Sequence, residues 1–218
     1  MRGKYRLPIN RFIIAIIVVL YIFGFFIYPY LPERVPSHWN MAGEVDGYSS
    51  RIFHILFLPT LILLLYLLMS FAPILDPRPD SYKKFQNIFE GFRWLMVGFM
   101  VLLYIVTTLF ALGYPLSIGK TMRFAIGLLL AFIGNYFGKI KHNYTFGIKT
   151  PWTLANEEVW NKTHRVSGPL WVITGLIWML SIFIAEKLSF FICMSLLIIV
   201  SLYGIVYSYI LFKKLQNQ

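Results

Sequence analysis

Long runs of apolar residues recur along the whole chain and constrain its fold more than any other feature. Six runs approach the roughly 20 residues that a helix needs to cross about 30 Å of hydrocarbon. Of the 218 residues, 58% are hydrophobic and 13% are charged, a balance that the core of a soluble domain does not need. Backbone groups in lipid must be satisfied internally, so these runs predict helices. We therefore expect an all-α fold, a polytopic transmembrane helix bundle of about six spans.

The chain divides into spans without a separate soluble domain. The predicted spans cover residues 12–30, 52–72, 94–116, 122–137, 169–185 and 188–212. The first run follows several basic residues, as a signal peptide does, but it is longer and lacks a small-residue cleavage site, which predicts a retained span. We expect one integrated bundle with an N-terminal membrane region, residues 1–138, and a C-terminal region, residues 139–218.

The net charge of +11 is better explained by the orientation of the chain in the membrane than by binding to nucleic acid. Lys and Arg residues lie in short segments between the apolar runs, and fifteen of the twenty fall in the two terminal segments and the alternate loops that share their side. The positive-inside rule then predicts cytoplasmic N- and C-termini. Cys193, the single cysteine, lies in the last run and can form neither an internal disulfide nor a cysteine-based metal cluster.

Residues 31–51 join the first two spans and should form a compact, ordered loop on the outer face, because they are rich in proline, glycine and Asp-Gly turn signals. The candidate binding residues here are His38, Trp39, Asn40, Gly43, Asp46 and Gly47. Together they offer an imidazole, a flat ring, an amide and a carboxylate for a small polar site. Residue chemistry alone favours a plainer interpretation, with an interfacial tryptophan, a solvated histidine, and side chains bonded to turn backbone.

A metal site in this loop would be incomplete. His38 and Asp46 supply two ligands, and His54, at the start of the next helix, is the only nearby candidate for a third. The sequence therefore predicts neither a metal nor any other cofactor.

Residues 139–168 form the second informative loop, on the predicted inner face. Thr150 and Pro151 are typical of a helix start, with a hydroxyl N-cap and proline at the first helical position, and Thr153 is an alternative N-cap. If that helix continues to Val166, its apolar residues share one face, which predicts a short interfacial helix along the membrane surface. Glu157 and Glu158 are adjacent, so they are better placed to stabilise a first helical turn than to act as paired acid and base.

Two long patterns in the chain are specific. Residues 143–165 read N-Y-T-F-G-I-K-T-P-W-T-L-A-N-E-E-V-W-N-K-T-H-R, and residues 32–48 read P-x-x-x-P-S-H-W-N-x-x-G-E-V-D-G-Y. The first closely resembles the signature of the SdpI family of bacterial immunity proteins. The second resembles the uncharacterised domain that commonly precedes that signature, and with their flanking spans the two patterns cover most of the chain.

This resemblance implies a bacterial plasma-membrane protein that protects its cell against a secreted killing peptide, the SDP toxin in the best-known case. It also implies a sensor that holds a transcriptional repressor at the membrane, with the outer loop facing the toxin. The candidate inner signalling surface that it implies consists of Asn143, Gly147, Lys149, Thr150, Pro151, Trp152, Asn156, Glu157, Trp160, His164 and Arg165.

Three hypotheses therefore remain open. The first is a non-enzymatic immunity and sensing protein, whose partners are the bilayer, a toxin peptide and a repressor, with no direct nucleic-acid contact. The second is a membrane enzyme, or a protein that binds a lipid or another small molecule, using His38 and Asp46. The third is a transporter, ranked last because only His54 and Arg123 place a readily charged side chain in a predicted span.

Overall fold

The computed structural model describes residues 9–217, which form a bundle of long helices with one small sheet. The elements in chain order are α1 (Arg11–Ile27), η1 (Tyr28–Tyr30), β1 (Arg34–Trp39), β2 (Val45–Ser50), α2 (Arg51–Leu75), η2 (Pro79–Lys84), α3 (Gln86–Ala111), α4 (Ile118–Phe137), α5 (Pro151–Ala155), α6 (Glu157–Leu180), η3 (Ser181–Phe183) and α7 (Glu186–Gln216). Six of the helices are long and apolar enough to cross a membrane. The predicted all-α bundle of six spans is confirmed.

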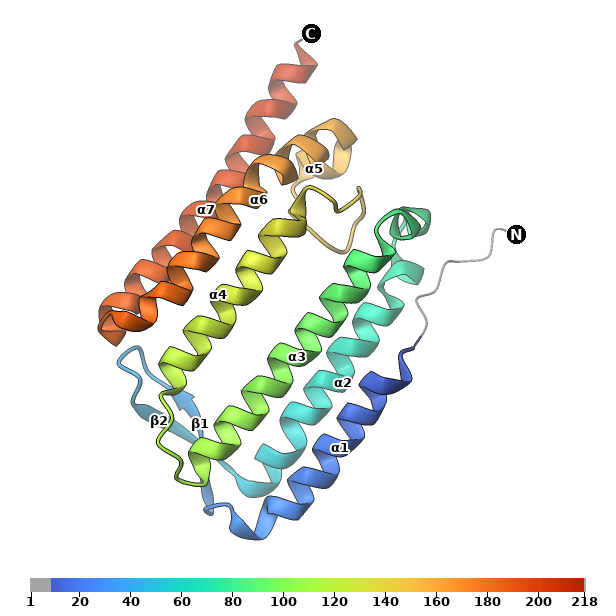
Figure 1. Ribbon diagram of the computed structural model, residues 1–218. Coiled ribbons are helices and arrows are strands. Elements are labelled where there is room, and N and C mark those ends of the chain that lie inside the picture. Colours follow the sequence, from blue (N-terminus) through green and yellow to red (C-terminus); the bar gives the residue numbers. More distant parts are fainter. Residues whose placement is uncertain (1–8, 218) are drawn as a thin grey trace.

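The helices form two groups of three (Figure 1). Helices α1, α2 and α3 lie side by side, and α4 lies with α6 and α7. The β1–β2 hairpin lies at one end of the bundle, called here the hairpin end. The loop of residues 138–150, together with α5 and η2, lies at the opposite end, called here the loop end. The two segments that the sequence singled out are therefore separated by the full length of the helices.

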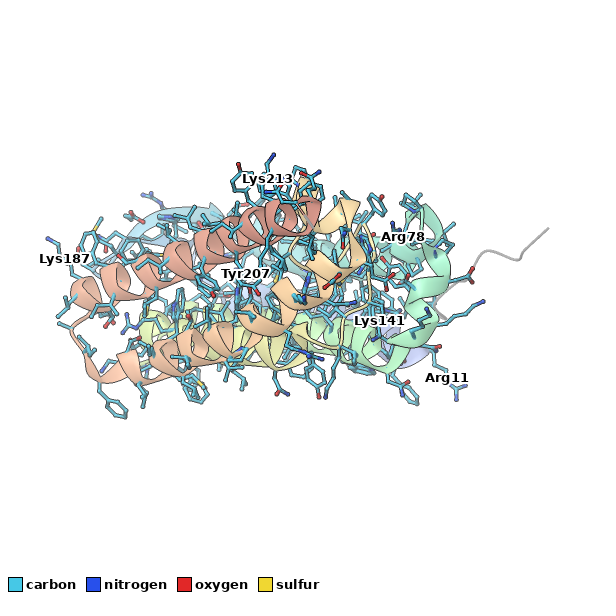
Figure 2. The ribbon with its side chains drawn as sticks, turned by 90° about the horizontal axis from the view of Figure 1, so that it is seen from above. Arg11, Arg78, Lys141, Lys187, Tyr207 and Lys213 are labelled. Atoms are coloured by element: carbon cyan, nitrogen blue, oxygen red, sulfur yellow. The ribbon has the colours of Figure 1, made fainter. Side chains whose placement is uncertain are left out.

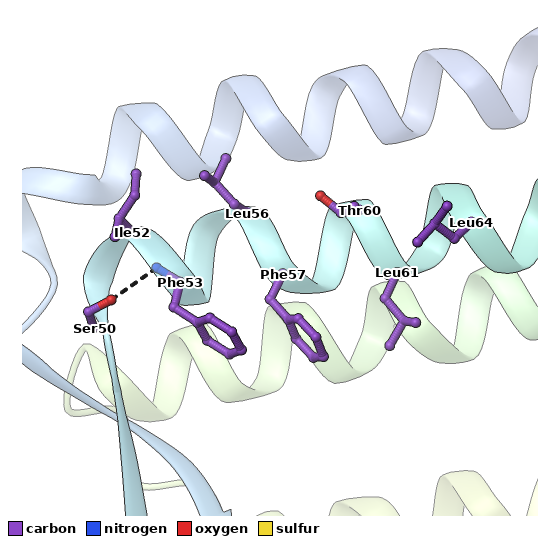
Figure 3. Close-up of a pocket in the computed structure, with 8 residues that line it drawn as sticks. All are labelled: Ser50, Ile52, Phe53, Leu56, Phe57, Thr60, Leu61 and Leu64. Carbon is purple, nitrogen blue, oxygen red and sulfur yellow. Dashed lines mark hydrogen bonds between the residues drawn. The ribbon is translucent and has the colours of Figure 1, made fainter.

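Helix α2 shows how local sequence sets the frame at the hairpin end. The Ser50 hydroxyl accepts a hydrogen bond from the Phe53 amide at 3.2 Å, an N-cap that starts the helix as the hairpin ends (Figure 3). From this start Phe53, Phe57 and Leu61 project from one side of the helix, and the two phenyl rings stack with centroids 4.7 Å apart. These side chains belong to a shallow, largely apolar groove, as expected for a surface that faces lipid.

The compact loop predicted for residues 31–51 is a two-stranded antiparallel hairpin. Arg34 pairs with Ser50 and Trp39 with Val45, and the register shifts on either side of His38. Gly43 has a φ of +81°, which glycine adopts without strain, so the turn expected there is present. The turn expected at Asp46 and Gly47 was wrong, because both residues lie within β2. The strands were not predicted because a proline in the first and a glycine in the second weaken a strand pattern.

Helices α4 and α6 are in close contact through glycine pairs. A Cβ added to Gly134 would lie 2.7 Å from the Gly168 carbonyl oxygen, and one added to Gly127 would lie 2.6 Å from that of Gly175. Both pairs therefore let the backbones touch, as small residues do in membrane helices. Gly134 and Gly138 form a G-x-x-x-G spacing, but an added Cβ at Gly138 would meet nothing closer than 3.8 Å, so only Gly134 lies at the tight contact.

The surface helix expected between Thr150 and Val166 is not continuous. Helix α5 ends at Ala155, and Asn156 is extended, with a φ of −141° and a ψ of 123°. The Asn156 side chain accepts hydrogen bonds from the amides of Glu158 and Val159, so it caps a new helix that continues to Leu180. The prediction of one interfacial helix was wrong beyond α5, because an N-cap in the middle of the segment restarts the helix.

The third span also begins earlier than predicted. Arg93, which the sequence analysis placed in a loop, lies inside α3 and is fully buried. Its guanidinium donates to Glu90 at 2.6 Å, to the Tyr66 hydroxyl at 2.7 Å and to the Ser70 hydroxyl at 2.8 Å. The prediction that only His54 and Arg123 place a readily charged side chain in a span was therefore wrong. It omitted Arg93, whose buried charge is stabilised by these hydrogen bonds.

Replacing Gly134 with alanine should lower the melting temperature, because the added methyl group meets backbone atoms that cannot move aside. We expect a loss of about 1–3 kcal/mol, the usual cost of overpacking. Gly98→Ala is the matched control, since nothing lies within 4 Å of its added Cβ and alanine favours a helix by up to about 1 kcal/mol. Thermal unfolding in detergent measures both; equal melting temperatures for the two variants would contradict the contact.

Candidate functional site

The most exposed polar pair of the hairpin is His38 and Asp46. The His38 Nδ1 atom and an Asp46 carboxylate oxygen lie 2.5 Å apart, and the two side chains are 71% and 45% exposed. Water therefore screens the pair on the hairpin surface, and its contribution to stability should be small. Both groups remain available to a partner that approaches from solvent.

The other hairpin candidates mostly build the hairpin itself. The Asn40 side-chain oxygen accepts from the amides of Ala42 and Glu44, which fixes the turn. The Trp39 ring packs edge-on against Phe110 of α3, with centroids 5.6 Å apart. Gly47 faces His38 across the strands, where an added Cβ would lie 2.8 Å from the His38 Cβ.

The third ligand proposed for a metal does not join the hairpin pair. His54 is buried in α2, and its Nε2 atom lies 2.9 Å from the Thr108 hydroxyl of α3. Within residues 9–217, no three His, Cys, Asp or Glu side chains gather closely enough to hold a metal ion. His54 thus connects two helices in this structure.

The tip of the hairpin reaches across to the second group of helices. Gly43 and Gly119 both lie against the carboxylate of Glu186, the first residue of α7. The Ser117 hydroxyl donates to the same carboxylate at 3.2 Å. Since Trp39 packs on α3, the hairpin contacts both helix groups and spans the boundary between them.

At the loop end, one tryptophan is enclosed by two histidines. The buried Trp160 ring stacks on His164 with centroids 4.2 Å apart, and on His142 with centroids 5.0 Å apart. Its indole N–H donates to the Ile140 carbonyl oxygen at 2.9 Å. This stack packs the 138–150 loop against α6.

Hydrogen bonds assign the protonation of His164. Its Nε2 atom accepts from the Ile148 amide at 2.8 Å, so Nδ1 carries the proton and donates to the Trp160 carbonyl oxygen at 2.8 Å. Gly147, beside this ring, has a φ of +118° and no room for a side chain, because an added Cβ would lie 2.5 Å from the His164 Nε2 atom. Gly147 and His164 are thus matched parts of one folded loop.

Asn143 and Thr150 complete the internal bonding of the loop. The fully buried Asn143 amide donates to two carbonyl oxygens and accepts from the amides of Thr145 and Phe146. Thr150 caps α5 in a reciprocal capping box with Thr153, as its position before Pro151 predicted. The Thr150 hydroxyl also lies 3.0 Å from that of Ser208, which ties the loop to α7.

A residue that the sequence analysis missed, Asp76, organises the loop end. Its buried carboxylate accepts from the Tyr144 amide at 2.8 Å, the Thr145 hydroxyl at 3.0 Å and the Tyr82 hydroxyl at 2.9 Å. Burial raises the pKa of Tyr82, which keeps this hydroxyl a donor. Asp76 follows α2, so it joins the first helix group to the loop of the second.

His142 makes a second link to the segment after α2. Arg78 donates to its Nδ1 atom, so Nε2 carries the proton and donates to the Leu154 carbonyl oxygen at 3.1 Å. Burial and the neighbouring Arg78 charge lower the pKa of His142, so the ring stays neutral. The signal that could have revealed this cluster is D-P-R-P-D at residues 76–80, where charged residues alternate with prolines beside a span.

The eleven residues of the candidate inner surface therefore separate by exposure. The buried ones are Asn143, Thr150, Trp160 and His164; the half-buried ones are Gly147, Trp152 and Asn156; the exposed ones are Lys149, Pro151, Glu157 and Arg165. Only the exposed and half-buried residues can contact a partner without unfolding the loop.

Comparison with known proteins finds two matching families. Residues 139–208 match the SdpI/YfhL protein family, and residues 15–63 match a domain of unknown function, DUF1648. The chain is also 28% identical over 210 residues to the immunity protein SdpI of Bacillus subtilis. These residues cover 94% of this chain and 97% of that protein. No solved structure matches the chain.

Asp76→Ala should destabilise the protein, because it leaves buried donors of the loop without an acceptor. We expect a loss of at least about 2 kcal/mol. Asp80→Ala is the control: that carboxylate is exposed and forms a surface ion pair with Lys83, whose loss should cost less than about 1 kcal/mol. Thermal unfolding compares the variants, and a loss for Asp80→Ala as large as that for Asp76→Ala would contradict the assignment.

Acid should weaken the loop end through His142. In the unfolded chain this imidazole takes up a proton as the pH falls through its ordinary pKa of 6.5, whereas the folded protein keeps it neutral to lower pH. The stabilisation is thus fully present above that value and is lost as the pH falls toward the folded pKa. His142→Gln should flatten the decline in melting temperature between about pH 7.5 and 5.5; a decline as steep as in the wild type would contradict the prediction.

Proposed function

We propose that this chain, whose residues 139–208 match the SdpI/YfhL protein family, is an immunity protein that protects its cell against a secreted antimicrobial peptide. The observation that carries the proposal is its similarity to an immunity protein along nearly the whole length of both chains. The relative is named for immunity, and here His38 and Asp46 lie exposed on the hairpin, where a partner can reach them from solvent. A binding role suits the pair better.

We place the hairpin end outside the cell and the loop end inside. The basic residues support this orientation, since the positive-inside rule favours the side with more Lys and Arg. Figure 2 shows Arg78 and Lys141 at one end of the bundle and Lys187 at the other. The hairpin then faces the space from which a secreted peptide would arrive.

The exposed hairpin side chains are the proposed contact for the peptide. Besides the His38 and Asp46 pair, Met41 is 47% exposed and Tyr48 is 50% exposed. The Arg34 guanidinium lies over the Tyr48 ring, 4.8 Å from its centroid. This mixture of charged, aromatic and apolar groups suits an amphipathic peptide at the membrane surface.

The exposed residues at the loop end are the proposed contact for a repressor. Lys149, Glu157 and Arg165 project from the loop and from the start of α6, whose buried faces are fixed by the loop-end bonds. Peptide binding outside would change repressor affinity inside only if each ligand prefers a different state of the bundle. The hairpin is placed for such coupling because it contacts both helix groups.

A toxin challenge tests the proposal. Sensitive bacteria that express the wild-type chain should survive an SDP-like peptide. For bacteria that express a His38→Ala/Asp46→Ala variant, the peptide concentration that kills should be at least about tenfold lower, as expected when charged contacts are lost. Lys187→Ala is the matched control, because that residue is exposed at the same end but lies outside the hairpin. Immunoblots must show equal amounts of protein. Unprotected cells with abundant wild-type protein would refute the immunity role.

A further inference from the structure

A cavity of about 460 Å³ lies beneath the hairpin, between the two helix groups. Hairpin residues 37–41 and Gly43 form part of its wall, and side chains of α3, α4, α6 and α7 form the rest. The lining is largely apolar and includes Leu103, Met122, Ile126, Trp178, Phe190 and Met194. Its volume falls within the range of roughly 300–1,000 Å³ that is usual for sites that bind small molecules.

One cation, Arg123, lines this cavity. The residue is only 9% exposed, and its Nε and Nη2 atoms are buried without a hydrogen-bond partner. Within the described part of the chain, Arg123 forms no ion pair, and its guanidinium donates no hydrogen bond. This differs from Arg93, which donates to three side chains in the same bundle.

If α4 begins at the headgroup level, Arg123 lies near the boundary between headgroups and hydrocarbon. It lies five residues into α4 from Ile118 at the hairpin end, which is about 8 Å at the rise of an α-helix. A buried arginine at such a depth is costly unless an anion pairs with it. An anion that enters the cavity would supply the missing acceptors.

The other charged group of the cavity is Glu186. It receives the Ser117 hydroxyl at 3.2 Å and lies beside Gly43 and Gly119, where the hairpin tip meets α7. The structure shows no Arg123–Glu186 ion pair among its described residues. The cavity therefore presents one positive and one negative group at separate points of an apolar wall.

We propose that this cavity binds the headgroup of a membrane phospholipid, with the phosphodiester on Arg123. The phosphate supplies a bidentate acceptor that a guanidinium recognises, and the acyl chains contact the apolar lining. Glu186 opposes a second negative charge and attracts an amine, so a zwitterionic ethanolamine headgroup fits best. The bilayer offers such groups at the depth of the cavity. The inference does not rest on the immunity role.

Lipid binding to the purified full-length chain tests the proposal. Native mass spectrometry from detergent would compare dioleoylphosphatidylethanolamine with dioleoylglycerol, which has the same tails but no phosphate. The wild type should retain the phospholipid at least about tenfold more strongly, the effect of a charged hydrogen-bonded contact. Arg123→Gln should remove this preference, whereas Lys120→Gln, at an exposed position on the same helix outside the cavity, should keep it.

Equal retention of the two lipids by the wild type would overturn the proposal, and that comparison does not depend on any variant. A phosphate preference that survives in Arg123→Gln would also overturn the site. Arg123→Lys keeps the charge and serves as the folding control, so it should retain part of the preference. Thermal unfolding of each variant without added lipid separates loss of the site from loss of the fold.

Discussion

A buried carboxylate, that of Asp76, is the constraint on which the loop end depends. An anion that is shielded from water must be surrounded by donors, and here the loop of residues 138–150 supplies two of them. That requirement holds Tyr144 and Thr145 in place, and the adjoining His142, Trp160 and His164 rings then stack in a fixed order. Much of the segment of residues 143–165 thus serves to build a rigid platform, and its few exposed side chains are left for recognition.

The two helix groups are joined at both ends of the bundle, and the two connections are built differently. The helix groups touch through α3 and α4, and each end adds a connector: the hairpin at one end, and the Asp76 and His142 bonds at the other. The glycine contacts between α4 and α6 make the second helix group tight by itself, whereas the space between the groups holds the Arg123 cavity. A ligand at the hairpin or in that cavity would act where the groups meet. A small shift between the helix groups at that point would move the rigid loop end and its exposed side chains.

Hydropathy alone predicted the six spans and the fold class, because the cost of burying backbone in lipid leaves little freedom. The N-cap at Thr150 was also predicted from the sequence, because it depends on the adjacent Pro151. The hairpin strands were not predicted because proline and glycine weaken a strand pattern, and the helix restart was not predicted because the Asn156 N-cap was not recognised. The place of Arg93 within α3 depends on bonds to Tyr66 and Ser70, which lie 27 and 23 residues away. The same limit applies to the candidate site: sequence grouped Trp160 with Arg165, and only packing shows that the first is buried and the second exposed. Asp76 was missed because its donors lie 68 and 69 residues away.

The central claim is that the hairpin and the loop segment lie on opposite sides of one membrane, held in a fixed relation by the bundle between them. Cysteine labelling in intact cells tests it most directly, in a Cys193→Ser background that removes the single native thiol. A thiol at His38→Cys should react with a membrane-impermeant maleimide from outside, and one at Lys149→Cys should react only after the cells are permeabilised. Both positions are exposed, so access to the reagent is the variable that differs. Reaction of both thiols in intact cells, or of neither, would contradict the account.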